Sequence, residues 1–121
     1  MKVVSFQGER ELKKLIEEKK EGVKEIEVVK LNEAKAMSQF LVFIRTAEQP
    51  HYHKEHDLTF VVLEGKGTLQ LDGKTYRLSA GDVGFIPRGK VHYYTNESVV
   101  SVLLATFSPR YDGKDSVKVE L

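Results

Sequence analysis

Short runs of alternating apolar and polar residues make up most of the chain after residue 23. In an extended strand, such alternation sends every second side chain to the same face. Turn-forming groups separate the runs, among them Asp72-Gly73 and Pro87-Arg88-Gly89. The pattern predicts strands over residues 24–31, 39–46, 58–63, 67–71, 74–78, 83–86, 91–95, 99–107 and, at the end, 116–121.

The N-terminal part has a helical period instead. Leu12, Leu15 and Ile16 recur at three- and four-residue spacing within residues 9–20, and charged side chains surround them. On a helix this spacing makes one narrow apolar stripe. Because the polar face carries both signs of charge, packing on the main body explains the stripe better than binding to a membrane surface. We expect residues 1–22 to form a helical extension.

Many short strands with no helices between them are typical of a β-sandwich or β-barrel. A chain of 121 residues is long enough for one such domain with its own core. Asp72-Gly73 lies between two alternating runs and is a strong signal for a two-residue hairpin turn. We therefore expect residues 1–121 to form a single all-β domain.

Charge and cysteine content narrow the function classes. The chain has 19 lysines and arginines against 18 aspartates and glutamates, so it lacks the basic excess typical of nucleic-acid binding. It has no cysteine, so any metal must be bound by nitrogen and oxygen. The start shows no signal-peptide pattern, and the apolar run at 99–107 is too short to cross a bilayer. We expect a cytoplasmic protein with no nucleic-acid or membrane partner.

Three of the four histidines fall within six residues, at positions 51, 53 and 56. In a strand, His51 and His53 would share one face, with Tyr52 on the other. Two imidazoles side by side are half of a metal site. The alternative is a solvated loop with scattered histidines, because histidine pairs also arise by chance.

The fourth histidine, His92, follows a segment with strong turn signals. Turns at Gly81 and at Pro87–Gly89 bound a short strand, and the second turn leads into the strand that holds His92. A sandwich brings strands that are distant in sequence face to face, which would place His92 opposite the other two imidazoles. Such a site could bind a metal with positions left open for water or substrate. Taken alone, His92 could instead be a core histidine bonded to a backbone carbonyl.

The segment Gly81-x5-Pro87-x-Gly89-x2-His92-x3-Asn96 resembles the second signature motif of the cupin family at every fixed position. Five fixed positions rarely coincide, so this signal is specific. Upstream, the first two histidines of the cluster, followed by a strand and a glycine-rich turn, resemble the family's first motif in part. Together the two motifs cover about residues 45–96.

The resemblance implies a double-stranded β-helix, the jelly-roll barrel of cupins, with its motif-bearing part at residues 39–107. It also implies one divalent transition metal, such as zinc, nickel, manganese or iron, on His51, His53 and His92. Cupins are often dimeric. Since strand-rich sandwiches leave edges that must be covered, we expect a homodimer paired through residues 24–31 or 117–121.

The first motif departs from the family's pattern in two places. Arg45 stands where the family has a glycine, and the family's glutamate ligand has no clear counterpart. Counting back from the glycine-rich turn reaches Leu58, which cannot bind metal, whereas counting forward from His53 reaches Asp57. A slip of one residue turns a side chain to the other face of a strand. The fourth ligand is therefore open between Asp57, His56 and water, with Asp57 favoured on chemistry and spacing.

Apolar residues on the same strand faces could wall a pocket over the metal. Phe60 and Val62 lie on one such face and Tyr94 shares a face with His92, although core packing is the usual role of such residues. No cluster of cations lies on these faces, which disfavours a phosphorylated sugar. We expect a small neutral or singly charged ligand with oxygen atoms, such as a hydroxy acid, a keto acid or a catechol-like ring.

Two function classes agree with these features. The first is a small metalloenzyme that acts on a small oxygen-bearing organic molecule, by Lewis-acid chemistry or, with iron, by oxygen chemistry. The alternative is a non-catalytic binding module for a sugar or organic acid. The sequence leaves the direction of Arg45 and Arg88 open, so an anionic ligand held by either remains an alternative.

Overall fold

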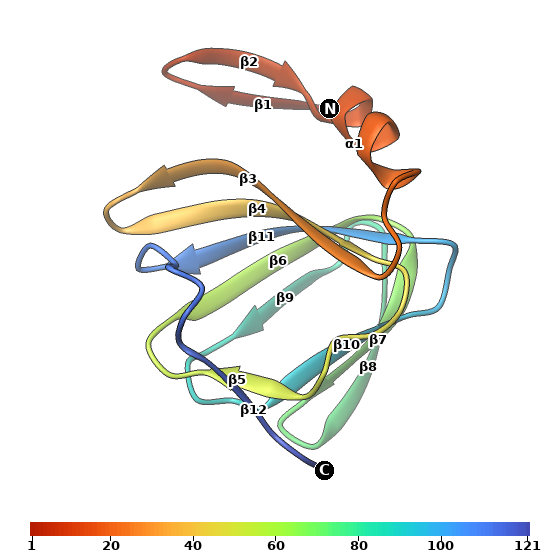
Figure 1. Cartoon of the computed structure of the whole chain (residues 1–121), viewed down its shortest axis with the longest axis vertical. Coiled ribbons are helices and arrows are strands. Elements are labelled where there is room, and N and C mark those ends of the chain that lie inside the picture. The colour runs from red at the N-terminus through yellow and green to blue at the C-terminus, as the bar shows by residue number, and fades with distance from the viewer.

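Two five-stranded antiparallel sheets face each other in the computed structural model, which describes residues 1–121 (Figure 1). One sheet contains, in spatial order, β3 (Ile26–Ala34), β4 (Met37–Ile44), β11 (Ser101–Ser108), β6 (Asp57–Glu64) and β9 (Val83–Ile86). The other contains β12 (Ser116–Lys118), β5 (His51–His53), β10 (His92–Asn96), β7 (Lys66–Leu71) and β8 (Lys74–Ser79). No strand pairing joins the two sheets, so the predicted jelly roll is confirmed in an open form rather than as a closed barrel.

The main core lies between the two sheets. Leu58, Phe60 and Val62 alternate along β6, point inward and join a cluster of eleven buried residues that also holds Tyr94 from the opposite sheet. Burial of each large apolar side chain contributes about 1.5–3 kcal/mol. A β-carbon on Gly84 would lie 2.4 Å from the Phe60 ring, so the second strand position of β9 needs glycine.

The hairpin predicted at Asp72-Gly73 is confirmed. It joins β7 to β8, and φ is 51° at Asp72 and 79° at Gly73. Positive φ at both central residues is what a type I′ turn requires, and this turn matches the twist of the two strands. The other strands predicted after residue 23 are also present, with ends that differ by a few residues.

The N-terminal extension differs from the prediction of a helix over residues 9–20. The first three of those residues belong to β2 (Gly8–Glu11), which pairs with β1 (Lys2–Ser5), and the helix α1 is Leu12–Lys20. The residues of β2 after Gly8 are charged and carry no apolar period, so pairing with β1 decides their conformation. Glu11 caps the helix instead, because its side chain accepts a hydrogen bond from a backbone N–H of the first turn.

Helix α1 covers the outer face of the β3–β4 side of the molecule (Figure 1). Leu12 and Ile16 are buried in a second cluster with Leu41 and Phe43. The apolar stripe read from the sequence therefore packs on the main body, as predicted. No helix in the structure has the length and apolar character needed to cross a membrane.

Arg45 fastens the end of this helix to the sheet. Its guanidinium donates hydrogen bonds to the backbone carbonyls of Lys20 and Val23, and a third to Val99, at 2.5, 2.6 and 3.3 Å. All three partners belong to the chain itself. Arg45 is thus a structural residue that satisfies carbonyls at the helix end.

Replacing this arginine should therefore affect folding and leave the histidines alone. Arg45→Ala is expected to lower the free energy of unfolding by about 1–3 kcal/mol, since hydrogen bonds to charged groups contribute on that scale. Urea denaturation measures the loss, and metal stoichiometry measured in parallel should stay unchanged. Wild-type stability together with weakened ligand binding would instead place Arg45 in a ligand site.

Candidate metal centre

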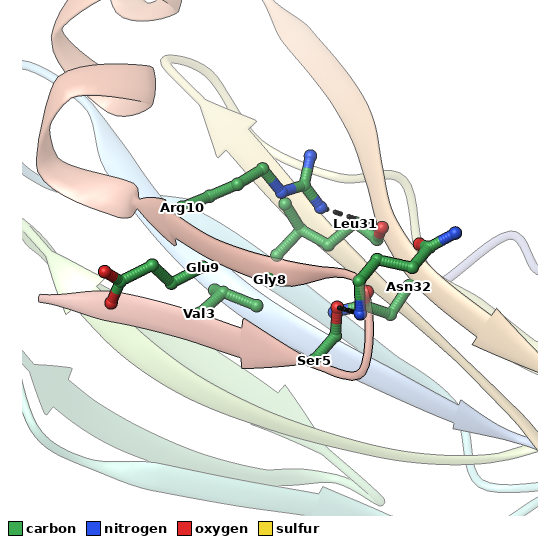
Figure 2. Close-up of a pocket in the computed structure, with 8 residues that line it drawn as sticks. Val3, Ser5, Gly8, Glu9, Arg10, Leu31 and Asn32 are labelled. Carbon is green, nitrogen blue, oxygen red and sulfur yellow. Dashed lines mark hydrogen bonds between the residues drawn. The ribbon is translucent and has the colours of Figure 1, made fainter.

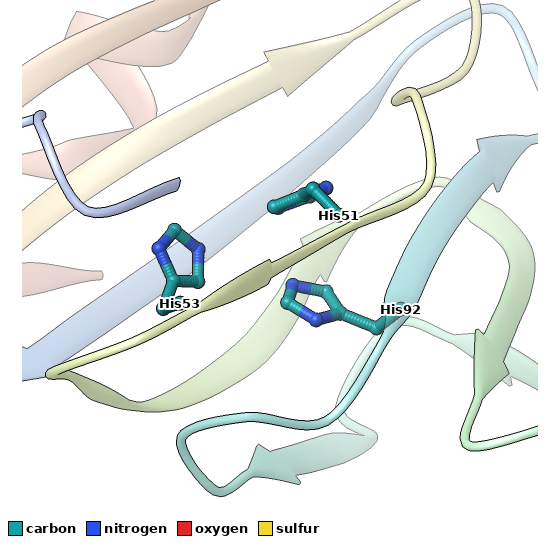
Figure 3. A group of neighbouring side chains, drawn as sticks. All are labelled: His51, His53 and His92. Atoms are coloured by element: carbon teal, nitrogen blue, oxygen red, sulfur yellow. The ribbon is translucent and has the colours of Figure 1, made fainter. Parts of the chain in front are cut away.

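Three histidines meet on one face of the second sheet. Strand β5 pairs with β10 so that His51 lies directly opposite His92, and His53 follows two residues along the same face. Their candidate ligand atoms all lie within 4.8 Å of one another (Figure 3). The ring centroids are 4.3 Å apart for His51 and His92 and 5.6 Å apart for His53 and His92.

This arrangement corrects one detail of the sequence prediction. His92 does not approach the other two imidazoles from the facing sheet, because β5 and β10 are neighbours in the same sheet. Directly paired residues of antiparallel strands have closely spaced side chains. The strand register alone therefore brings these side chains together.

In all three histidines the same ring nitrogen, Nδ1, is hydrogen-bonded to an oxygen of the protein. Nδ1 of His51 lies 2.7 Å from the carbonyl oxygen of Gln49, and Nδ1 of His92 lies 3.0 Å from that of Lys90. Nδ1 of His53 lies 3.0 Å from Oδ1 of Asp115. These oxygens only accept, so each Nδ1 carries the proton and each neutral ring keeps its lone pair on Nε2. The three Nε2 lone pairs are therefore free to bind a metal.

His92 has a buried ring nitrogen that no group of the protein satisfies. Its side chain is 2% exposed, and Nε2 is buried without a hydrogen-bond partner. Burial, helped by the neighbouring His51 and His53, outweighs the bond to Lys90 and lowers the pKa of His92 to about 4, so the ring is neutral at pH 7. Burial also lowers the pKa of His53. A buried, unpaired acceptor is rare and unfavourable, and a divalent metal on Nε2 would satisfy it.

The structure does not bring Asp57 to the three imidazoles. Asp57 opens β6, which belongs to the other sheet, and its carboxylate accepts hydrogen bonds from the backbone and side chain of Arg88 at 3.0–3.2 Å. Hydrogen bonds from Arg88 lower the pKa of Asp57. Asp57 thus holds the turn before His92, and this ion pair also occupies Arg88.

His56, the alternative fourth ligand, also has other partners. Nδ1 is bonded to Oδ2 of Asp115, and Nε2 lies 2.9 Å from the carbonyl oxygen of Arg110. Both partners are acceptors, so both ring nitrogens carry protons and His56 is an imidazolium. Burial lowers its pKa, but the bonds to Asp115 and Arg110 outweigh burial and raise it. A ring with two N–H groups has no lone pair for a metal.

Two carboxylates near the histidines were missed by the sequence reasoning. Asp115 lies 62 residues from His53 in the chain, within a polar loop that carries no motif. Although burial raises its pKa, hydrogen bonds from His56 and His53 bring the pKa of Asp115 down to about 2. Glu48 precedes the histidine cluster, and its Oε1 accepts the backbone N–H of Tyr94 at 3.0 Å. Only the proximity of Glu48 to His51 in sequence could have suggested it.

Two small spaces adjoin the histidines. An internal cavity of about 50 Å³ is lined by His92, Glu48 and mostly apolar side chains, including Phe60 and Tyr94. Val62 is fully buried but does not line it. A shallow pocket of about 290 Å³ borders His51 on the outside, and Glu48 lines this one as well. Burial raises the pKa of Glu48, which His51 partly opposes.

Residues 44–106, which include both histidine strands, match the family described as Cupin domain. The chain belongs to the cupin family. One of the two counts for the family's glutamate reaches Leu58, whose side chain is buried and lines the internal cavity. The other count reaches Asp57, whose carboxylate is bonded to Arg88. The three imidazoles are positioned to hold a metal, with no carboxylate in their group.

Similar proteins support the family and leave the reaction open. An uncharacterized protein of Aquifex aeolicus (strain VF5) is 61% identical over 112 residues, which cover 93% of either chain. Quercetin 2,3-dioxygenase of Bacillus subtilis (strain 168) is 36% identical over 59 residues, which are 49% of this cupin and 18% of that protein. The structure of KdgF from Halomonas sp. is 28% identical with a TM-score of 0.69, covering 72% of this cupin and 81% of that chain.

Metal binding can be tested with matched substitutions. Isothermal titration of the metal-free protein should give about one divalent ion per chain. His92→Ala should weaken binding as severely as His53→Ala, because each removes one of three equivalent Nε2 donors. Asp57→Asn is the comparison and should weaken binding less than either histidine variant, since Arg88 occupies that carboxylate and its loss affects only the turn before His92. Full metal affinity in His92→Ala would contradict the three-histidine site.

Stability of the metal-free protein should fall between pH 6.5 and pH 4. The folded protein keeps His92 neutral down to a pKa of about 4, whereas the unfolded chain binds this proton near pH 6.5. Proton uptake by the unfolded state alone lowers the free energy of unfolding by about 3 kcal/mol across this window. The raised pKa of His56 affects stability at higher pH instead. Its contribution to the free energy of unfolding is fully present below pH 6.5 and is lost as pH rises through the folded pKa.

Denaturation at several pH values measures this loss, and His92→Gln is the comparison. The variant has no imidazole at position 92 to titrate, so its stability should fall less steeply from pH 6.5 to pH 4. Equal slopes for the two proteins would show that His92 does not have the lowered pKa.

Proposed function

We propose that this cupin is a small metalloenzyme that holds one divalent transition metal on His51, His53 and His92 and acts on a small oxygen-bearing organic molecule. The unpartnered Nε2 of His92 carries the proposal, because it is a buried lone pair next to two other free ring nitrogens. Catalytic metal sites keep a position open, whereas structural sites are closed by protein ligands. Three histidine donors without a carboxylate fit the catalytic kind.

The bound metal would supply Lewis acidity toward an oxygen of the ligand, or oxygen chemistry if it is iron. The residues around it have separate tasks. Phe60 and Tyr94 exclude water from the internal cavity. Glu48 borders both spaces, and Oε1 is already bonded to the backbone of Tyr94. Its Oε2 is therefore the atom that can take or give a proton near the ligand.

The surroundings favour a small ligand of low charge. The internal cavity has room for only a few atoms, and the pocket beside His51 has a volume of about 290 Å³. Arg45 and Arg88 are both occupied by partners in the chain, so neither provides the cluster of donors that a phosphate needs. The similarity to a quercetin 2,3-dioxygenase agrees with a hydroxylated organic ligand.

A ligand screen tests both the reaction and the non-catalytic alternative. Metal-loaded and metal-free protein are compared by thermal shift against unphosphorylated hydroxy acids, keto acids and catechols on one side and sugar phosphates on the other. We expect stabilisation by the unphosphorylated compounds only when metal is bound, followed by their conversion in mass spectrometry. Binding without any conversion would favour a sugar- or organic-acid-binding module, and stabilisation by phosphates alone would contradict the proposed ligand class.

We also propose that this cupin is a homodimer. Strands β3 and β12 are outer strands of their sheets, and Ile26 and Val28 on β3 are 42% and 54% exposed. Exposed apolar side chains on an unpaired edge favour pairing with another chain. Sedimentation at micromolar concentration should find a dimer, and a monomer alone would contradict it. Location in the cytoplasm stays a prediction.

A further inference from the structure

The chain returns to the histidines after the end of β11. Residues 109–115 lead into β12, which pairs with β5 and places Ser116 opposite His53. Figure 1 shows this C-terminal segment lying beside β5. Asp115 is the last residue before β12 and is 8% exposed. A carboxylate is rarely buried to this extent unless it is paired.

Asp115 accepts hydrogen bonds from the end of β5 and from the three residues that follow it. Oδ1 accepts from Nδ1 of His53 at 3.0 Å, and Oδ2 accepts from Nδ1 of His56 and from the backbone N–H of Glu55. The backbone carbonyl of Asp115 accepts from the N–H of Lys54. Three bonds to the carboxylate and one to the backbone carbonyl thus fix Asp115 against residues 53–56.

His56 secures the same segment at a second point. Its Nε2 donates to the carbonyl of Arg110 at 2.9 Å, so one imidazolium bridges the two ends of the 110–115 loop. Tyr111 lies in sequence between Arg110 and Asp115. Its ring centroid is 5.3 Å from that of His53, and the ring stacks on Phe107 with the centroids 4.3 Å apart. The loop is thus held by polar and aromatic contacts together.

We propose that Asp115 is a positioning residue for the metal centre, and that the Asp115–His56 pair couples metal binding at His53 to docking of residues 109–118. The proposal rests on the metal site proposed above. The carboxylate keeps the proton of His53 on Nδ1 and Nε2 free, fixes the orientation of the ring and raises its basicity. His56 prevents the carboxylate from turning away, because it occupies the second oxygen.

Coupling of this kind must act in both directions. A metal on Nε2 of His53 strengthens the Nδ1–H bond to Asp115 and so favours the docked segment. Conversely, loss of the docked segment frees the His53 ring to rotate and weakens metal binding. No other histidine of the centre has this link, because His51 and His92 are oriented by backbone carbonyls two residues away.

The test compares Asp115→Asn with Asp112→Asn, a matched change at an exposed position of the same loop. Metal affinity by chelator competition should fall on the order of 10–100-fold in Asp115→Asn, the scale of such outer partners, and should not change in Asp112→Asn. In a His53→Ala background, Asp115→Asn should cause no further loss of affinity, because its effect passes through that ring. A purely structural role would lower stability but leave affinity unchanged.

Hydrogen exchange on the wild-type protein keeps the test valid if Asp115→Asn does not fold. Zinc should slow exchange of the backbone amides at 110–118, and His56→Gln should reduce this protection. Tight zinc binding with no change in exchange there would overturn the coupling, and wild-type affinity in Asp115→Asn would overturn the positioning role. Failure of the unmodified chain to bind zinc, nickel, manganese or iron would overturn the metal site as well.

Discussion

The antiparallel pairing of β5 with β10 is the contact on which the centre depends. It sets His51 opposite His92 in a single register pair, and the two-residue period of β5 adds His53 on the same face. A shift of one residue would turn the paired imidazoles to the other face. The features that hold β10 in place therefore also determine the geometry of the site.

Those features lie largely within the second motif. Asn96, at its end, donates to the carbonyls of Arg45 and Ser98 and so closes the loop after β10. In its middle, the turn before β10 is held by the bond from the backbone N–H of Arg88 to Asp57. Gly89 adds a bond to the carbonyl of His53. The motif thus works by fixing backbone on either side of His92, and of its residues only His92 belongs to the three-histidine group.

Local alternation and turn residues were sufficient to predict an all-β sandwich or barrel, and the resemblance to the cupin motifs supplied the jelly roll and the set of three histidines. The sequence was insufficient where a contact between residues far apart in the chain decides a residue's conformation or role. Residues 9–11 became strand by pairing with β1, and Asp57 was favoured as a ligand because spacing does not reveal that Arg88 binds its carboxylate. Asp115 could not be found at all, since its role depends on a loop that returns over His53 from 62 residues away.

The central claim is that three Nε2 lone pairs converge on one ion while three Nδ1 protons stay bonded to the protein. Nitrogen-15 NMR of the imidazole rings, recorded with and without zinc, tests it directly. The account predicts that Nδ1 of His51, His53 and His92 remains protonated and that only the Nε2 resonances shift with zinc. His56 should remain protonated on both nitrogens. Zinc-induced shifts at Nδ1, or at His56, would contradict the account.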